Sequence, residues 1–175
     1  MQTKNGLRIA LSMLALLVIG GVIFNNFKGS NTLPVQGGLP EKVEAKRQAI
    51  YAAAKSEDYE KIAKEAGTPF NYSFGGEYEG GFVGYLKLAA ENEGRSAFDI
   101  LPTLLQMPYV LRGSTYTWPS VFVKTANEWT DEDIAQMKKI MTDEQIEEYR
   151  KFGSYAYYRL GISEEGNWAY YLAGD

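Results

Sequence analysis

The sequence predicts an α+β protein, in which an N-terminal transmembrane helix precedes helices packed on one face of a curved antiparallel sheet. Hydrophobic residues make up 45% of the 175 residues and charged residues 23%, which is typical of a globular chain with a core. Helix patterns occur in clusters rather than alternating with strands, which favours an α+β fold. The chain ends in two β-rich segments around a short turn, which indicates a terminal β-hairpin.

The chain contains no Cys and no His. This composition excludes thiol and imidazole nucleophiles, Ser-His-Asp triads, structural zinc sites, iron–sulfur clusters and disulfides. Any catalysis would have to use carboxylates, Tyr, Lys, Arg, Ser, Thr or a hard metal bound by carboxylates. The acidic cluster at 131–133 lacks the spacing and the Gly of an EF-hand, so we expect no metal site and no cofactor.

Residues 9–24 form the first expected element, an apolar run without a charged side chain. As a helix this run is about 24 Å long, slightly shorter than the hydrocarbon core of a bilayer, a deficit that flanking side chains can cover. Lys4 and Arg8 precede the run, whereas all 22 acidic residues follow Pro40. The positive-inside rule therefore predicts a single pass through the lipid bilayer, with the C-terminal domain outside the cytoplasm.

Two alternatives to an uncleaved anchor remain open at this point. A cleaved signal would give a secreted or periplasmic protein, but residues 25–28, which follow the run, offer no pair of small residues for cleavage. A buried core helix is the second alternative. A lipid-modified cysteine is excluded because the chain has no Cys.

The segment 28–39 is rich in Gly and small polar residues and also contains Pro. Such a composition is typical of a flexible tether that does not pack into a core. The sequence therefore divides into an anchor or signal segment at 1–27, a linker at 28–39 and an extracytoplasmic α+β domain at 40–175.

Two helices and a strand are expected to open this domain. Pro40 suits the first turn of a helix that extends to about residue 55. Ser56 is a suitable N-cap for a second helix over residues 58–66. Aromatic residues at alternate positions predict a strand over residues 70–74.

The middle of the domain is expected to contain two further helices and two strands. The helices are predicted over residues 81–92 and 100–107, the second behind a capping-box pattern that begins at Ser96. The β-rich segments at 109–112 and 115–124 follow.

Two more helices and the hairpin complete the predicted order. Thr130 and Thr142 are predicted to begin helices. Acidic residues follow Thr130, and a Gln three residues after Thr142 completes a capping box. Residues 155–162 and 167–173 are predicted to pair as the hairpin, with Gly166 supplying a left-handed turn residue.

Part of this pattern resembles a known group of proteins. The opening AIYAAAKSEDYEKIAKEAGTPFNYSF resembles the start of the cone-shaped α+β domains related to nuclear transport factor two and the polyketide cyclases. The segments YTWPSVFVK and YYRLGISEEGNWAYYLAGD are similar to a group of uncharacterised bacterial envelope proteins. The first resemblance implies a pocket but no activity, because the Asp-His pair of the cyclases has no counterpart in a chain without His.

Aromatic side chains supply the candidate binding site. The chain contains 13 Tyr, 8 Phe and 3 Trp, and many lie on predicted strands, where Trp168 and Tyr170 are expected to share one face. These rings can pack the sheet against the helices, or they can line a concave pocket for a small apolar or carbohydrate ligand. The predicted pocket residues are Tyr72, Phe74, Tyr116, Trp118, Tyr157 and Tyr170.

Carboxylates and arginines supply further candidates. Two carboxylates can hydrolyse glycosides, and Glu77, Glu79 and Asp99 are the acids in suitable central positions. However, Asp99 has a structural role as a capping residue, and the two glutamates belong to a Gly-rich loop. Arg112 and Arg159 lie on predicted strands, where a buried arginine needs a partner.

The sequence therefore predicts a membrane-anchored extracytoplasmic binding or interaction module of the bacterial cell envelope, without catalytic machinery. The alternative is a carboxylate-dependent hydrolase that acts on envelope polymers. The predicted partners are the lipid bilayer, through residues 9–24, and either a small ligand or an envelope protein. Nucleic acid is not expected, because the acidic body lacks the clustered Lys and Arg that neutralise phosphates.

Overall fold

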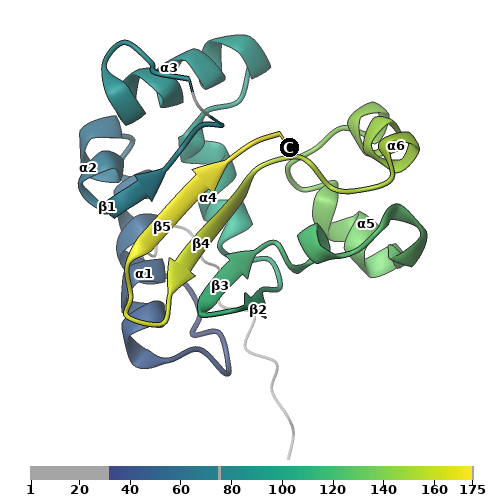
Figure 1. The fold of residues 1–175 in the computed structure, drawn as a ribbon, viewed down its shortest axis with the longest axis horizontal. Coiled ribbons are helices and arrows are strands. Elements are labelled where there is room, and N and C mark those ends of the chain that lie inside the picture. Colours follow the sequence, from purple (N-terminus) through teal and green to yellow (C-terminus); the bar gives the residue numbers. More distant parts are fainter. Residues whose placement is uncertain (1–31, 75, 175) are drawn as a thin grey trace, which may run out of the picture.

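The structure, a computed structural model, describes residues 32–74 and 76–174. Five strands form one sheet: β1 (Ala66–Asn71), β2 (Val110–Arg112), β3 (Thr115–Trp118), β4 (Arg159–Ser163) and β5 (Trp168–Leu172). Their order across the sheet is β1-β5-β4-β3-β2, and helices surround it (Figure 1). The α+β class predicted from the sequence is confirmed.

The two longest helices begin and end close to the predicted residues. Helix α1 (Glu41–Lys55) begins directly after Pro40, whose fixed φ suits a helix start. Helix α3 (Gly81–Glu93) ends at Gly94, which has a φ of 64° in the left-handed region. Local chemistry therefore explains where α1 begins and where α3 ends.

Three further helices begin behind a capping box. They are α4 (Ala97–Leu104), α5 (Asp131–Met137) and α6 (Asp143–Phe152), capped by Ser96, Thr130 and Thr142. In each box the side chain three residues into the helix accepts a hydrogen bond from the backbone N–H of the capping residue. These three starts confirm the predicted ones.

Helix α2 (Tyr59–Lys64) is shorter than predicted, and its cap is Asp58 rather than Ser56. The Asp58 carboxylate accepts hydrogen bonds from the backbone N–H groups of Glu60 and Lys61, which have no partner inside the helix. The Ser56 hydroxyl instead donates to a carbonyl of α1 and so belongs to the preceding helix.

The strand predicted over residues 115–124 ends at Trp118. Pro119 follows, and it has no N–H group to donate to a neighbouring strand. The chain continues as two 3₁₀ helices, η1 (Ser120–Val123) and η2 (Ala126–Glu128). The chain therefore leaves the sheet ladder after Trp118, and residues 120–123 are helical.

The sheet is mixed, so the prediction of an antiparallel sheet is wrong for one pair. Strand β1 runs parallel to β5, whereas the β2–β3, β3–β4 and β4–β5 pairs are antiparallel. The direction of β1 depends on where the intervening helices return the chain to the sheet, and no local pattern encodes that. The terminal hairpin is confirmed: Trp168 is fully buried, and the turn residues Glu164 and Glu165 are exposed.

A β-bulge in β5 places Trp168 and Tyr170 on opposite faces of the sheet. Ile162 pairs with Trp168 and Gly161 with Tyr170, so one step on β4 corresponds to two steps on β5. Trp168 therefore points into the core, while Tyr170 lies on the other face. The prediction that these two residues share a face is wrong for this reason.

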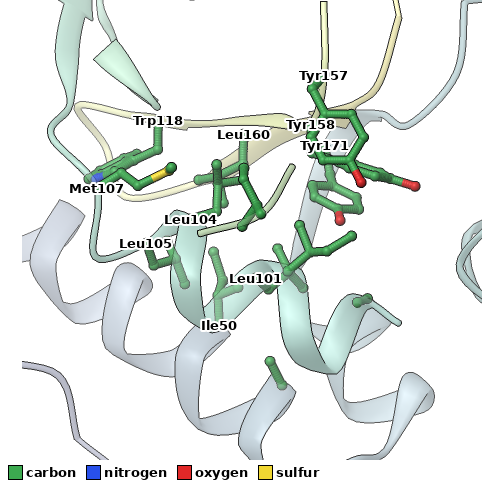
Figure 2. Packing of buried hydrophobic residues seen from close by; sticks show 14 of the residues in the cluster. Ile50, Leu101, Leu104, Leu105, Met107, Trp118, Tyr157, Tyr158, Leu160 and Tyr171 are labelled. Atoms are coloured by element: carbon green, nitrogen blue, oxygen red, sulfur yellow. The ribbon is translucent and has the colours of Figure 1, made fainter. Parts of the chain in front are cut away.

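Core side chains fill the space between the sheet and helices α1 and α4. In Figure 2, Ile50 of α1, Leu101 and Leu104 of α4 and the following Leu105 lie opposite Leu160 of β4, with labelled tyrosines at one end and Trp118 beside Met107 at the other. Each such side chain contributes about 1.5–3 kcal/mol when fully buried. In Figure 1, α1 and α4 lie behind β4 and β5, so the view is onto the opposite face, which we call the outer face.

Residues 32–39, which we call the N-terminal strap, pack against the domain although their composition predicts a tether. Leu33 is only 5% exposed, and its backbone exchanges two hydrogen bonds with the side chain of Gln48. The Gln36 side chain donates to the carbonyl of Met107 and accepts from the Trp118 indole. This part of the predicted linker is therefore tied to α1, to β3 and to the chain after α4.

The apolar run at 9–24 lies outside the described residues, and so does the start of the predicted linker. Within the described ranges, no helix has both the length and the apolar character needed to cross a bilayer. The predicted anchor and the division at residues 27 and 39 stay predictions.

Candidate ligand-binding site

Three of the six predicted pocket residues lie in the core. Tyr116, Trp118 and Tyr157 are 8%, 0% and 4% exposed and belong to the cluster between the sheet and the helices. Their rings contribute to packing, because neighbouring side chains occupy the concave space that a ligand would need. These three residues therefore fit the alternative interpretation of the sequence, in which aromatic rings pack the sheet against the helices.

Tyr72 and Phe74 follow β1, and their side chains have different surroundings. Tyr72 packs against the rings of Phe82 and Tyr85, at centroid distances of 5.4 and 5.8 Å. Phe74 is 57% exposed, and its ring lies 5.4 Å from the guanidinium carbon of Arg159. Phe74 therefore borders the outer face, whereas Tyr72 supports α3.

Tyr170, the sixth predicted residue, lines a hollow of about 440 Å³ on the outer face of the sheet. This volume lies within the range of about 300–1,000 Å³ for small-molecule sites. Alternate residues of β3, β4 and β5 form its floor, since successive strand residues point to opposite faces. The residues around the hollow are Arg112, Gly113, Thr115, Thr117, Phe122, Arg159, Tyr170 and Leu172.

The ring of Tyr170 packs against β4 at Gly161. A Cβ atom at position 161 would overlap this ring, so the absence of a side chain there lets the ring lie on the backbone. The Tyr170 hydroxyl is 2.6 Å from the Thr117 hydroxyl on β3. The ring therefore spans three strands and is held at both ends.

Two arginines meet at one phenylalanine beside this ring. The guanidinium carbons of Arg159 and Arg112 lie 4.6 and 5.7 Å from the centroid of the Phe122 ring. Arg159 is only 7% exposed and donates a 2.6 Å hydrogen bond to the carbonyl of Gly174. Arg112, on the short edge strand β2, is exposed. The guanidinium group of Arg159 is thus held in place, whereas that of Arg112 is open to solvent.

The charges of two arginines act on the Tyr170 hydroxyl in the hollow. Burial raises the pKa of the Tyr170 hydroxyl, while its hydrogen bond with Thr117 and the charges of Arg159 and Arg112 oppose that rise. Both guanidinium groups therefore act on the same polar atom. Among the eight described residues that line the hollow, two are arginines and none is acidic.

The sequence indicated only part of this site. Phe122 was missed because the β-rich pattern extended the strand through residue 124, whereas the residue lies on η1. Arg112 and Arg159 were considered as partners of carboxylates rather than as neighbours. One signal in the sequence was available. Arg112, Thr115 and Thr117 alternate with apolar residues in β2 and β3, so the three polar side chains lie together on one face of the sheet.

The candidate catalytic carboxylates do not converge in the structure. Asp99 accepts hydrogen bonds from the backbone and the hydroxyl of Ser96, so it is engaged in the cap of α4. Glu77 and Glu79 are exposed in the loop before α3. In the described part of the chain, no three side chains of the His, Cys, Asp or Glu types are grouped to hold a metal ion.

A second hollow, of about 590 Å³, lies along α1 and α4. Its charged residues are Lys55, Arg95, Lys139 and Asp99, so it contains both signs of charge. Lys55, Lys139 and Asp99 are exposed, and solvent screens them. The outer-face hollow is the better candidate, because its charges have one sign and one of them is buried.

Comparison of the chain with protein-family models, with curated proteins and with solved structures found no match.

Proposed function

We propose that this protein is a membrane-anchored, extracytoplasmic binding module of the bacterial cell envelope, and that its ligand binds on the outer face of the sheet. The observation that carries the proposal is the hollow of about 440 Å³, at which a buried arginine, a fixed tyrosine ring and an exposed arginine meet. Such a site combines apolar walls with a few oriented polar groups, as ligand sites do.

The cellular location in this proposal rests on the sequence. The uncharged run at 9–24, the basic residues before it and the absence of acidic residues before Glu41 favour a single segment with the domain translocated. The candidate carboxylates Glu77 and Glu79 are exposed, and Asp99 is engaged in a helix cap. This arrangement is consistent with a binding module that has no catalytic groups of its own.

The location is tested by fractionating cells that produce the native protein and measuring its intact mass. Membrane-bound material that retains residue 1 or 2 supports the anchor. A soluble form that begins between residues 21 and 35 would mean that the run is a cleaved signal. Full-length soluble protein in the cytoplasm would contradict both.

Binding is tested by melting the purified full chain with soluble fragments of bacterial envelope polymers. A fragment that binds the native state raises the Tm. We expect this rise to disappear in Thr115→Trp, because an indole on β3 fills the hollow. Leu88→Trp, at an exposed position on α3, is the matched control and should keep the rise. An equal rise in both variants would place binding elsewhere.

A further inference from the structure

We propose that the second hollow, which lies along α1 and α4, binds a compact ligand that carries two or more phosphate or carboxylate groups. Lys55, Arg95 and Lys139 bind these groups together. This site is separate from the outer-face hollow, so the inference does not depend on the proposed function.

Three separate parts of the chain bring the cations to this hollow. Lys55 is the last residue of α1, Arg95 lies between α3 and α4, and Lys139 lies between α5 and α6. Residues 41–175 contain more acidic than basic side chains, so a group of three cations differs from the charge of the domain around it. The three residues are far apart in the sequence, and no local pattern groups them.

The three cations form no ion pair within residues 32–74 and 76–174. Glu93 and Asp99, which flank Arg95 in the sequence, are engaged elsewhere. Glu93 accepts hydrogen bonds from two tyrosine hydroxyls, and Asp99 accepts them from the backbone and hydroxyl of Ser96. The guanidinium of Arg95 therefore keeps its fork of donors, which matches the oxygens of a carboxylate or a phosphate.

The balance of charge in the hollow favours an anion. Asp99 is the one acidic residue among the described lining residues. Its carboxylate lies at the start of α4, where the partial positive charge of the helix N-terminus offsets part of its charge. Three cations therefore face a single acid that already has partners.

The exposure of these cations favours a ligand with several charges. Lys55 and Lys139 are exposed, and Arg95 is half-buried. An exposed ion pair contributes little free energy, because water and salt screen it. A ligand with several anionic groups engages the cations at the same time but loses its translational freedom only once. Two or more anionic groups in one molecule are therefore needed for appreciable affinity.

The size and the walls of the hollow favour a compact ligand. Its volume of about 590 Å³ lies within the range of about 300–1,000 Å³ for small-molecule sites. Tyr51 and Phe98 line it with aromatic rings, and the Phe98 ring stacks on Tyr59 at a centroid distance of 4.3 Å. These rings can contact the carbon atoms between the anionic groups.

The test titrates the purified full chain with tripolyphosphate, citrate and inorganic phosphate at one ionic strength, and calorimetry measures each affinity. We expect tripolyphosphate or citrate to bind at least about tenfold more tightly than inorganic phosphate. The affinity should fall as salt is added. A preference for tripolyphosphate identifies phosphate groups, and a preference for citrate identifies carboxylates. Inorganic phosphate that binds as tightly as both, or failure of all three probes, would overturn the inference.

Amide chemical shifts locate the bound probe. We expect the resonances of α4 and of residues 138–140 to move on saturation. Changes confined to β3 and β4 would place the anion on the outer face of the sheet and would also overturn the inference.

Substitutions then assign the contacts. Arg95→Gln should weaken the preferred probe about tenfold, and Lys55→Gln about two- to fivefold, because that lysine is exposed. Lys87→Gln is the matched control. Lys87 is an exposed lysine of α3 that is not among the lining residues and forms no ion pair within the described ranges. Equal losses in Arg95→Gln and Lys87→Gln, or unchanged affinity in Arg95→Gln, would contradict a specific site.

Discussion

Gly161 shows how one residue shapes the candidate site. The ring of Tyr170 occupies the space that a side chain at 161 would fill, and its hydroxyl meets Thr117 at 2.6 Å. Glycine in a strand is usually unfavourable, because it lacks packing atoms and loses more backbone entropy than other residues. Here the Tyr170 ring supplies the packing, and it also forms part of the lining of the hollow.

We expect Gly161→Ala to lower the free energy of unfolding by about 1–3 kcal/mol, because the new methyl group displaces the Tyr170 ring. Urea unfolding measures this change. Gly37→Ala is the matched control, since no atom lies within 4 Å of a Cβ there, and its stability should stay within about 0.5 kcal/mol. Equal stability of the two variants would show that the ring does not rest on Gly161.

Glu93 organises a second group of tyrosines at the residue scale. Its carboxylate oxygens accept hydrogen bonds from the hydroxyls of Tyr157 and Tyr158, at 2.8 and 2.9 Å. Burial raises the pKa of both hydroxyls, and the negative charge of Glu93 adds to the rise. The neighbouring Tyr85 has a pKa raised to about 12, mainly by burial.

These pKa values predict a loss of stability at alkaline pH. A raised pKa means that the folded state favours the protonated phenol, so its contribution is complete below pH 10 and declines as pH rises. The free energy of unfolding in urea should therefore fall between pH 10 and about 12, the range set by Tyr85. Glu93→Gln should lower stability by about 1 kcal/mol at neutral pH and reduce the alkaline loss. A flat profile above pH 10 would contradict the burial of these hydroxyls.

At the scale of elements, helix starts follow local chemistry, whereas strand lengths also depend on tertiary packing. The capping boxes at Ser96, Thr130 and Thr142 were all recognisable in the sequence, because each needs only residues three positions apart. Strands β3 and β4 are shorter than their β-rich sequences predict. Residues 155–158 illustrate the reason: their aromatic rings reach the core from irregular chain, so high β-propensity reflects burial there rather than pairing.

Thr142→Ala should remove the cap of α6 and lower the free energy of unfolding by about 1 kcal/mol. The Thr142 hydroxyl accepts a hydrogen bond from the backbone N–H of Gln145 at 3.2 Å, and alanine offers no acceptor. Thr142→Ser keeps the hydroxyl and should be nearly neutral. Urea unfolding compares the two variants, and similar losses in both would argue against a capping role.

At the scale of the whole molecule, the strap joins the N-terminal part of the chain to the domain. Arg47, 2% exposed, donates hydrogen bonds to the carbonyls of Pro34 and Leu105 and pairs with Glu44. It thereby links the strap, α1 and the end of α4.

The packing of the strap is tested by two neighbouring apolar residues. Leu33→Ala should lower the free energy of unfolding by about 2–3 kcal/mol, because Leu33 is buried in the core cluster. Val35→Ala is the matched control, since Val35 is 81% exposed, and its stability should not change. An unpacked tether would leave both variants as stable as the native chain.

The sequence by itself determined the α+β class, most helix positions, the terminal hairpin and the burial of Trp168. These features depend on residues close together in the chain: caps, glycines after helices and hydrophobic periodicity. Only the tertiary structure decided the parallel direction of β1, the packed strap and the hollow on the outer face. The hollow needs Arg112, Phe122, Arg159 and Tyr170 together, and a one-residue bulge in β5 determines which face Tyr170 occupies. Pairing between distant strands places that bulge, so no local pattern specifies the site.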